Sequence, residues 1–220
     1  MMGKINSKVL ISAIGLFVFA ACSELAKHHE NSGQVPLQTY IITYKTTVNQ
    51  DQLKSQSIMT QWIDNVNNRF AVQTKTNTEI GERKLSGESL MIQSDGWSYV
   101  INLTEKSGFK SKSPDNETLI KTYARPSDEK QFREMIEDEN GKILGNEVLL
   151  TRQCVVIEIT EAAEEGAKLL TKMWYYNGIP LKMVNKYATM EAITFDENVL
   201  IPLDKFQVPV DVEINTIPSF

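Results

Sequence analysis

The chain has 220 residues, 41% of them hydrophobic and 23% charged, and its formal net charge is −5 at pH 7. An acidic chain without a basic run lacks the electrostatic footprint of a nucleic-acid-binding protein, and it carries no polybasic patch for anionic lipid headgroups. This length suits one folded domain.

The first residues have the layout of a secretory signal. Lys4 and Lys8 precede an apolar run over Val9–Ala21. At about 13 residues this run is shorter than the ~20 that span a bilayer, and it ends in the small residues Ala20 and Ala21, as at a cleavage site. We therefore predict a signal peptide over residues 1–21 rather than a transmembrane helix.

The segment Phe19-Ala20-Ala21-Cys22 places a cysteine directly after the small residues. It resembles a bacterial lipobox, which implies that Cys22 is the lipidation site and carries diacylglycerol and a further fatty acid such as palmitate. One acyl chain holds a protein only marginally at a membrane, whereas several hold it stably. An ordinary cleaved signal in which Cys22 is incidental is the alternative.

Residues 22–36 read as a flexible tether that spans ~20 Å root-mean-square. Both histidines of the chain, His28 and His29, lie in it. Two adjacent side chains on a flexible segment do not make a metal site, so we predict no metal and no cofactor. The lipobox resemblance places the protein in the cell envelope, and Ser23 in place of an aspartate favours the outer membrane by analogy.

From Leu37 the chain alternates apolar and polar residues in short runs, typical of antiparallel strands. Predicted strands cover Leu37–Val48, Gln56–Ile63, Arg69–Thr76, Leu90–Gln93 and Trp97–Leu103. Short turns such as Ser94-Asp95-Gly96 join them into a meander. The polar stretches Thr78–Ser86 and Lys106–Asn116 are predicted to be loops.

One amphipathic helix is expected over Asp128–Glu139. Phe132, Met135 and Ile136 have helical spacing, acidic residues occupy the first turn, and Asn140-Gly141 is a stop signal. Such a stripe normally packs against the core, so we expect it to face the sheet.

The last third of the chain returns to strands: Glu147–Leu150, Gln153–Ile159, Leu169–Tyr176, Ile179–Tyr187 and Thr189–Phe195. Asn177-Gly178 supplies the two positive-φ residues of a type I′ hairpin turn. The pair Glu147–Leu150 and Gln153–Ile159 is expected to be central in the sheet and covered on both faces, and Cys154 lies in the second of these runs. It is interpreted as a buried small hydrophobic residue, and a reactive thiol is the alternative.

The hairpin Trp174-Tyr175-Tyr176-Asn177-Gly178-Ile179-Pro180-Leu181-Lys182, with Phe206-Gln207-Val208-Pro209 after it, resembles a family of largely uncharacterised bacterial envelope proteins. These proteins have the half-barrel fold of the lipoprotein carriers LolA and LolB. The resemblance implies a mostly β (α+β) domain over residues 37–220, in which a curved antiparallel sheet wraps one or two helices. It also implies a concave side able to hold an acyl chain.

Catalytic motifs are absent from the sequence. No Gly-rich phosphate loop or nucleophile elbow occurs, and the only imidazoles lie in the tether, so we predict that the protein is not an enzyme. Two hypotheses remain: a membrane-anchored binding module for a lipid or other hydrophobic ligand, or an envelope protein-interaction module without a small ligand. Aromatic and methionine side chains line apolar pockets, and the predicted lining residues are Trp62, Trp97, Tyr99, Met173 and Trp174.

Overall fold

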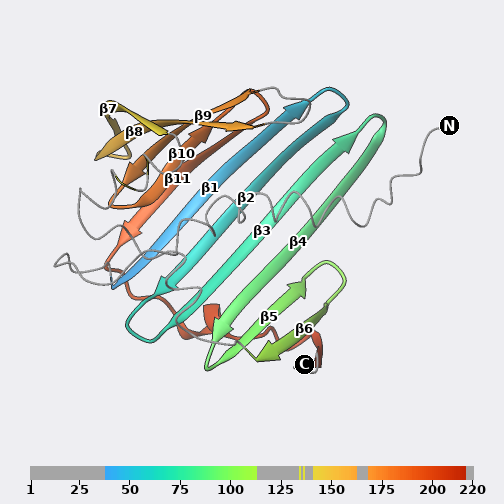
Figure 1. The fold of residues 1–220 in the computed structure, drawn as a ribbon. Helices are drawn as coiled ribbons and strands as arrows, with labels where there is room; N and C mark the ends of the chain where they lie inside the picture. The colour runs from blue at the N-terminus through green and yellow to red at the C-terminus, as the bar shows by residue number, and fades with distance from the viewer. Residues whose placement is uncertain (1–37, 113–133, 135, 137–140, 163–167, 217–220) are drawn as a thin grey trace.

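A computed structural model describes residues 38–112, 134, 136, 141–162 and 168–216. These residues form one open sheet of twelve strands, in the order β12-β6-β5-β4-β3-β2-β1-β11-β10-β9-β8-β7 (Figure 1). The strands are β1 (Thr39–Gln50), β2 (Leu53–Asp64), β3 (Arg69–Ile80), β4 (Arg83–Ser94), β5 (Trp97–Asn102), β6 (Ser107–Lys112), β7 (Gly141–Leu149), β8 (Arg152–Ala162), β9 (Lys168–Tyr176), β10 (Ile179–Val184), β11 (Ala188–Glu197) and β12 (Glu213–Thr216), with a 3₁₀ turn η3 (Leu203–Phe206). Neighbouring strands are antiparallel, apart from β12, which runs parallel to β6.

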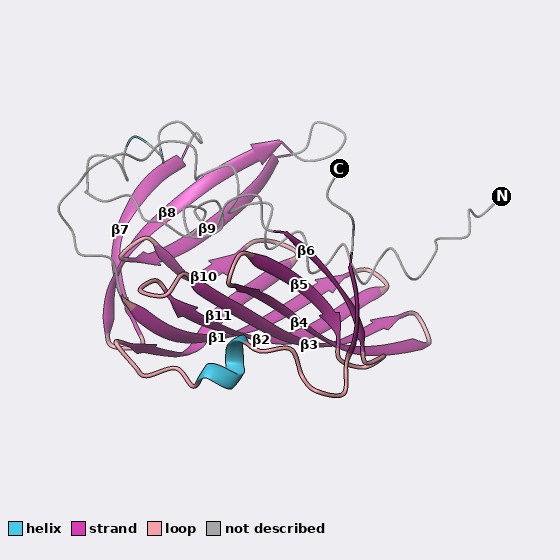
Figure 2. Cartoon of the chain, turned by 90° about the horizontal axis from the view of Figure 1, so that it is seen from below, coloured by secondary structure: helices cyan, strands magenta, loops and turns pink. Residues whose placement is uncertain are grey.

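The sheet is curved. In Figure 2, β7–β9 at one side and β5–β6 at the other rise in the same direction from a floor formed by β1–β3, and η3 lies beneath that floor. The side chains of each strand alternate between the two sides of a sheet. We call the side between the raised strands the concave face and the side that carries η3 the convex face.

The main core lies on the concave face. Residues of β1–β3 and β11 pack there against residues of β8–β10. This concave cluster consists of Tyr40, Ile42, Tyr44, Met59, Ile63, Phe70, Val72, Cys154, Val156, Trp174, Ile179, Leu181, Met190, Ala192 and Phe195. Strands distant in the sequence therefore hold one another in the curved arrangement.

A second cluster, which we call the convex cluster, covers part of the convex face. Ile201 and Phe206, in the segment that follows β11, pack against the buried Ala71, Ile92 and Ile101 of β3–β5. The other half of the alternating residues of these strands is thus buried at this end of the sheet.

Arg152, at the start of β8, links the turn between β7 and β8 to strand β11. Its guanidinium donates hydrogen bonds to the carbonyl oxygens of Leu150 (2.8 Å) and Phe195 (2.7 Å). It also lies 4.5 Å from the ring centroid of Phe195 and 3.6 Å from a carboxylate oxygen of Glu197. Since these hydrogen bonds are charge-assisted, they fasten the β7–β8 turn to the end of β11.

A third cluster lies on the opposite side of β8 and β9 from Cys154. It contains Ile157, Ile159, Met173 and Tyr175, and the buried Ile136 packs on it. Ile136 also lies against Gly141 of β7, since a Cβ added to this glycine would be 2.6 Å from Ile136 Cγ2. The rest of the predicted stripe, Phe132 and Met135, lies outside the described residues.

The predicted fold class is wrong in one respect. A mostly β (α+β) domain whose sheet wraps one or two helices was expected, but the described residues form a nearly all-β structure, and their sheet wraps no helix. The described residues bury their apolar side chains by packing strand against strand, as in the concave cluster, and of the predicted helix they include only Glu134 and Ile136.

Each predicted strand is present, but two predicted loops are not loops. The stretch Thr78–Ser86 forms the ends of β3 and β4, and Ser107–Lys112 is strand β6. These runs are polar because they extend beyond the core, and backbone pairing with neighbouring strands holds them. Gly108 is required there, since an added Cβ would lie 2.7 Å from the carbonyl oxygen of Val100.

The hairpin turn between β9 and β10 is confirmed. Asn177 and Gly178 have φ values of 48° and 75°, as a type I′ turn requires. The expectation that the pair β7 and β8 is central and covered on both faces is confirmed only for β8, where Cys154 and Ile157 are both buried. It is wrong for β7, which is an edge strand of the sheet and leaves Val148 exposed, because no strand of the described residues pairs with its outer side.

We expect Gly178→Val to lower the free energy of unfolding by about 1–2 kcal/mol, because left-handed backbone is strained for a residue with a branched Cβ. Gly87→Val in β4 is the matched control, since that glycine has open space around its Cβ position and no positive φ. Urea denaturation of both variants measures the difference. Equal stability of Gly178→Val and the wild type would contradict the turn assignment.

Candidate functional site

An apolar row runs across the concave face from the core to the surface. Val72, Met91, Val100 and Phe109 are direct cross-strand neighbours on β3, β4, β5 and β6. Val72 is buried and Met91 is half-buried, whereas Val100 is 59% exposed and Phe109 54% exposed. The concave cluster therefore continues onto β5 and β6 as an open apolar surface, which we call the apolar row.

The flanks of the apolar row are small and uncharged. On one side Ser98 pairs with Ser111, and on the other Asn102 pairs with Ser107. Residues two apart on a strand share a face, so all four lie on the same face as Val100 and Phe109. This surface can therefore hold an apolar group, and its flanks carry no charged side chain that would select the polar part of the ligand.

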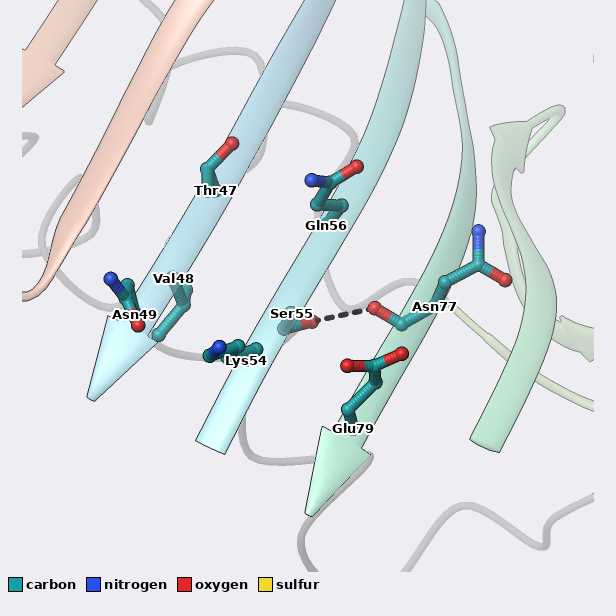
Figure 3. A pocket seen from close by; sticks show the side chains of 8 residues that line it. All are labelled: Thr47, Val48, Asn49, Lys54, Ser55, Gln56, Asn77 and Glu79. Carbon is teal, nitrogen blue, oxygen red and sulfur yellow. Dashed lines mark hydrogen bonds between the residues drawn. The ribbon is translucent and has the colours of Figure 1, made fainter. Parts of the chain in front are cut away.

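A hollow of about 410 Å³ lies at the other end of the sheet, beside the β1–β2 turn (Figure 3). It is lined by Thr47, Val48, Asn49, Lys54, Ser55, Gln56, Asn77 and Glu79. Inside it the Ser55 hydroxyl donates a hydrogen bond of 3.3 Å to the carbonyl oxygen of Asn77. Only Val48 is apolar among these residues, so the hollow is unsuited to an acyl chain.

The indole of Trp174 is held by charges on β7, β9 and β10. Its Nε1–H donates a 2.7 Å hydrogen bond to Glu147, and the ammonium groups of Lys172 and Lys182 lie 4.5 Å and 5.4 Å from its ring centroid. The bond from Trp174, followed by that from Lys172, holds the pKa of Glu147 below its ordinary value of 4.5. Trp174 is thus a structural residue of the concave cluster with its polar edge satisfied.

The structure does not bring the five predicted lining residues together. Trp62 and Tyr99 belong to the convex cluster, beneath the segment that follows β11. Met173 lies in the third cluster and Trp174 in the concave cluster. Trp97, at the start of β5, lies under the ammonium of Lys110, 5.0 Å from its ring centroid. Their role in binding a ligand stays a prediction.

The residues of the apolar row were missed by the sequence reasoning. The predicted lining residues Trp97 and Tyr99 lie on one face of β5, and Val100 points to the other face of the same strand. Phe109 was placed in a loop. The available signal was Phe109 itself, an aromatic residue in the middle of the serine- and lysine-rich run Ser107–Lys112.

The two cysteines differ in what the structure describes. Cys22 lies outside the described residues, as do the predicted signal and tether. Cys154 is a free, buried cysteine, and burial raises the pKa of its thiol. Since the nucleophilic form is the thiolate, the interpretation of Cys154 as a buried small hydrophobic residue is confirmed.

The described residues hold no group of three or more His, Cys, Asp or Glu side chains placed to bind a metal ion. They also include no helix with the length and apolar character of a membrane span.

No family model and no curated protein matches the chain. Solved structures similar to it include LprF from Mycobacterium bovis, with 12% identity, a TM-score of 0.38, and coverage of 74% of this chain and 89% of that one. The MucA/MucB complex of Pseudomonas aeruginosa matches with 10% identity and a TM-score of 0.45. The match covers 90% of this chain and 62% of the matched chain.

A putative outer membrane lipoprotein-sorting protein domain from Vibrio parahaemolyticus is also similar, with 10% identity, a TM-score of 0.25, and coverage of 87% and 95% of the two chains. With TM-scores below 0.5, these likenesses assign the chain neither a family nor a function.

Glu147→Gln should remove a pH-dependent part of the stability. A carboxylate whose pKa is lowered by folding stabilises the protein above its unfolded pKa, and this contribution is lost as the pH falls through the folded pKa. The difference in unfolding free energy between wild type and Glu147→Gln should therefore be greatest above pH 4.5 and shrink below it.

Urea unfolding across this pH range measures the difference, with Glu105→Gln at an exposed turn as the control. A difference between wild type and Glu147→Gln that is independent of pH would show that the Trp174 hydrogen bond does not favour the ionised carboxylate.

Proposed function

We propose that this protein is a lipid-anchored module of the cell envelope that binds a lipid or another hydrophobic ligand without catalysis. The observation that carries the proposal is the apolar row: Val100 and Phe109 are exposed on the same face of the sheet as the concave cluster and lie beside it. The anchor part rests on the lipobox resemblance at Cys22, and the non-catalytic part on the position of both histidines before residue 37.

The apolar row has the dimensions for part of an acyl chain. Neighbouring strands lie about 4.8 Å apart, so Met91, Val100 and Phe109 cover about 10 Å across β4–β6. Each methylene buried there contributes ~0.8 kcal/mol, so about five would give a gross ~4 kcal/mol before the cost of association. This supports weak, reversible binding of an apolar chain.

Because the flanks of the apolar row are uncharged, ligands with different polar headgroups could bind there. Ser98 and Ser111 on one side and Asn102 and Ser107 on the other offer hydrogen bonds but no fixed charge. We therefore propose that the apolar chain is recognised and that its headgroup is not.

A protein-interaction module is the second candidate, and strand β7 supports it. This strand is one edge of the sheet, and Leu144 and Val148 on it are exposed. An edge strand offers unpaired backbone groups that an extended peptide can join. The bulge near Gly145, with its φ of 141°, and the charged Lys142 and Glu147 oppose unspecific pairing there.

Cys22→Ser tests the anchor. The substitution should move the protein from the membrane to the soluble fraction and abolish incorporation of labelled fatty acid, because the thioether carries the diacylglycerol. Fractionation and labelling of cells that express each form measure both effects. Unchanged membrane association of the serine variant would contradict lipidation.

The released Cys22→Ser protein allows the ligand site to be tested in solution. Titration with a fluorescent fatty acid should show saturable binding, and replacing both Val100 and Phe109 by serine should weaken it by about tenfold or more, since each lost ~1.4 kcal/mol of apolar contact is a factor of ten. Ile58→Ser, at an exposed apolar residue on the convex face, is the matched control. Equal affinity of the double variant and the control would favour the protein-interaction candidate.

A further inference from the structure

Three apolar side chains project into solvent at the end of the sheet where β1 begins. Leu200 is 96% exposed, Val66 62% and Leu203 60%. We call these three residues the β1 rim. They lie in the turn between β2 and β3 and in the segment that follows β11.

Hydrogen bonds tie both segments of the rim to the first residues of β1. The N–H of Asn65 donates to the carbonyl oxygen of Gln38 (2.8 Å), and the N–H of Asn198 donates to that of Thr39 (2.8 Å). The Thr39 hydroxyl in turn donates to the carbonyl oxygen of Val199 (2.7 Å). The rim is therefore built around the point where the described domain starts.

Leu200 and Leu203 are held outward by their neighbours. Ile201 and Phe206 are buried in the convex cluster, and η3 begins directly after Pro202. Because the buried residues fix this segment against β3 and β4, the two leucines are presented to solvent on an ordered backbone. Apolar residues contribute nothing to folding in that position.

Trp62 and Lys205 lie behind the rim. The ammonium of Lys205 is 5.8 Å from the ring centroid of Trp62 and 3.5 Å from a carboxylate oxygen of Asp204. Tryptophan and lysine side chains, with an apolar body and a polar end, favour the headgroup layer of a membrane. A protruding leucine pair with such residues behind it fits the boundary between headgroups and acyl chains.

The position of the first described residue indicates what the β1 rim contacts. Gln38, at the rim, is the first described residue, and the predicted tether of residues 22–36 would leave it only ~20 Å from the anchor. We propose that the β1 rim docks on the surface of the bilayer that holds the anchor, an inference that rests on the proposed lipidation of Cys22. Because the chain is acidic, the contact is apolar rather than electrostatic.

Docking through the rim would orient the whole sheet. The 12-residue strands β1–β4 would lead away from the membrane and place the β3–β4 turn about 40 Å from the rim end. Val100, three residues along β5 from Trp97 at the rim end, would lie about 10 Å from it. The apolar row would then open close to the source of acyl chains.

The test uses the full, anchored chain in vesicles of phosphatidylethanolamine and phosphatidylglycerol that contain a nitroxide-labelled lipid. With Cys22 acylated and Cys154 buried, Leu200→Cys takes an environment-sensitive fluorophore alone. Lys84→Cys, at the far end of β4, is the matched control. We expect a blue shift and at least about twofold stronger quenching at position 200, since rim contacts enter ~5–10 Å into the headgroup boundary.

A double variant and a second vesicle composition complete the test. Replacing Val66 and Leu203 by glutamate in the labelled chain should lower the quenching to that at position 84, with the melting temperature as a folding control. The signal should persist in vesicles of phosphatidylcholine alone, because the contact is apolar. Quenching that requires phosphatidylglycerol would overturn the apolar contact.

The outcomes separate the rim from the anchor. Flotation of the protein with vesicles, together with equal quenching at positions 200 and 84, would overturn rim docking and leave lipidation intact. Failure of the unlabelled wild-type chain to float, with no fatty acid incorporated, would overturn lipidation and rim docking with it.

Discussion

The packing of strand against strand across the concave face is the constraint on which the rest of the structure depends. Tyr40, Ile42 and Tyr44 of β1 share one cluster with Trp174 of β9 and Leu181 of β10. A flat sheet would leave these side chains apart and exposed, and their burial stabilises the curved arrangement by about 1.5–3 kcal/mol for each large residue. The sheet is therefore curved because curvature buries the side chains that form the main core.

The two faces of the sheet are covered unequally, and this difference creates both proposed surfaces. On β5 the convex side faces the cluster that Ile101 shares with Ile201 and Phe206 of the segment after β11, whereas the concave side leaves Val100 open. The same segment carries Leu200 outward at the start of β1. The segment that follows β11 thus covers the convex face near β5 and also gives the domain an apolar end.

Part of the candidate site was accessible from the sequence. Alternation in β5 correctly groups Trp97, Tyr99 and Ile101 on one face, because successive side chains of a strand point to opposite sides. The assignment of Trp97 and Tyr99 as lining residues depended on which face stays open. That choice was not local, since η3 and its neighbours, about a hundred residues later, cover the face with the aromatic residues.

The sequence by itself determined the features that depend on nearby residues: the alternating strands, the positive φ of Asn177 and Gly178, and the burial of Cys154 in an apolar run. Only the tertiary structure decided that polar runs such as Ser107–Lys112 are strands and that the sheet wraps no helix in the described part of the chain. The reason is that pairing and coverage come from segments distant in the sequence. The free energy of a polar strand or an open face depends on its partner, and no local pattern records which partner that is.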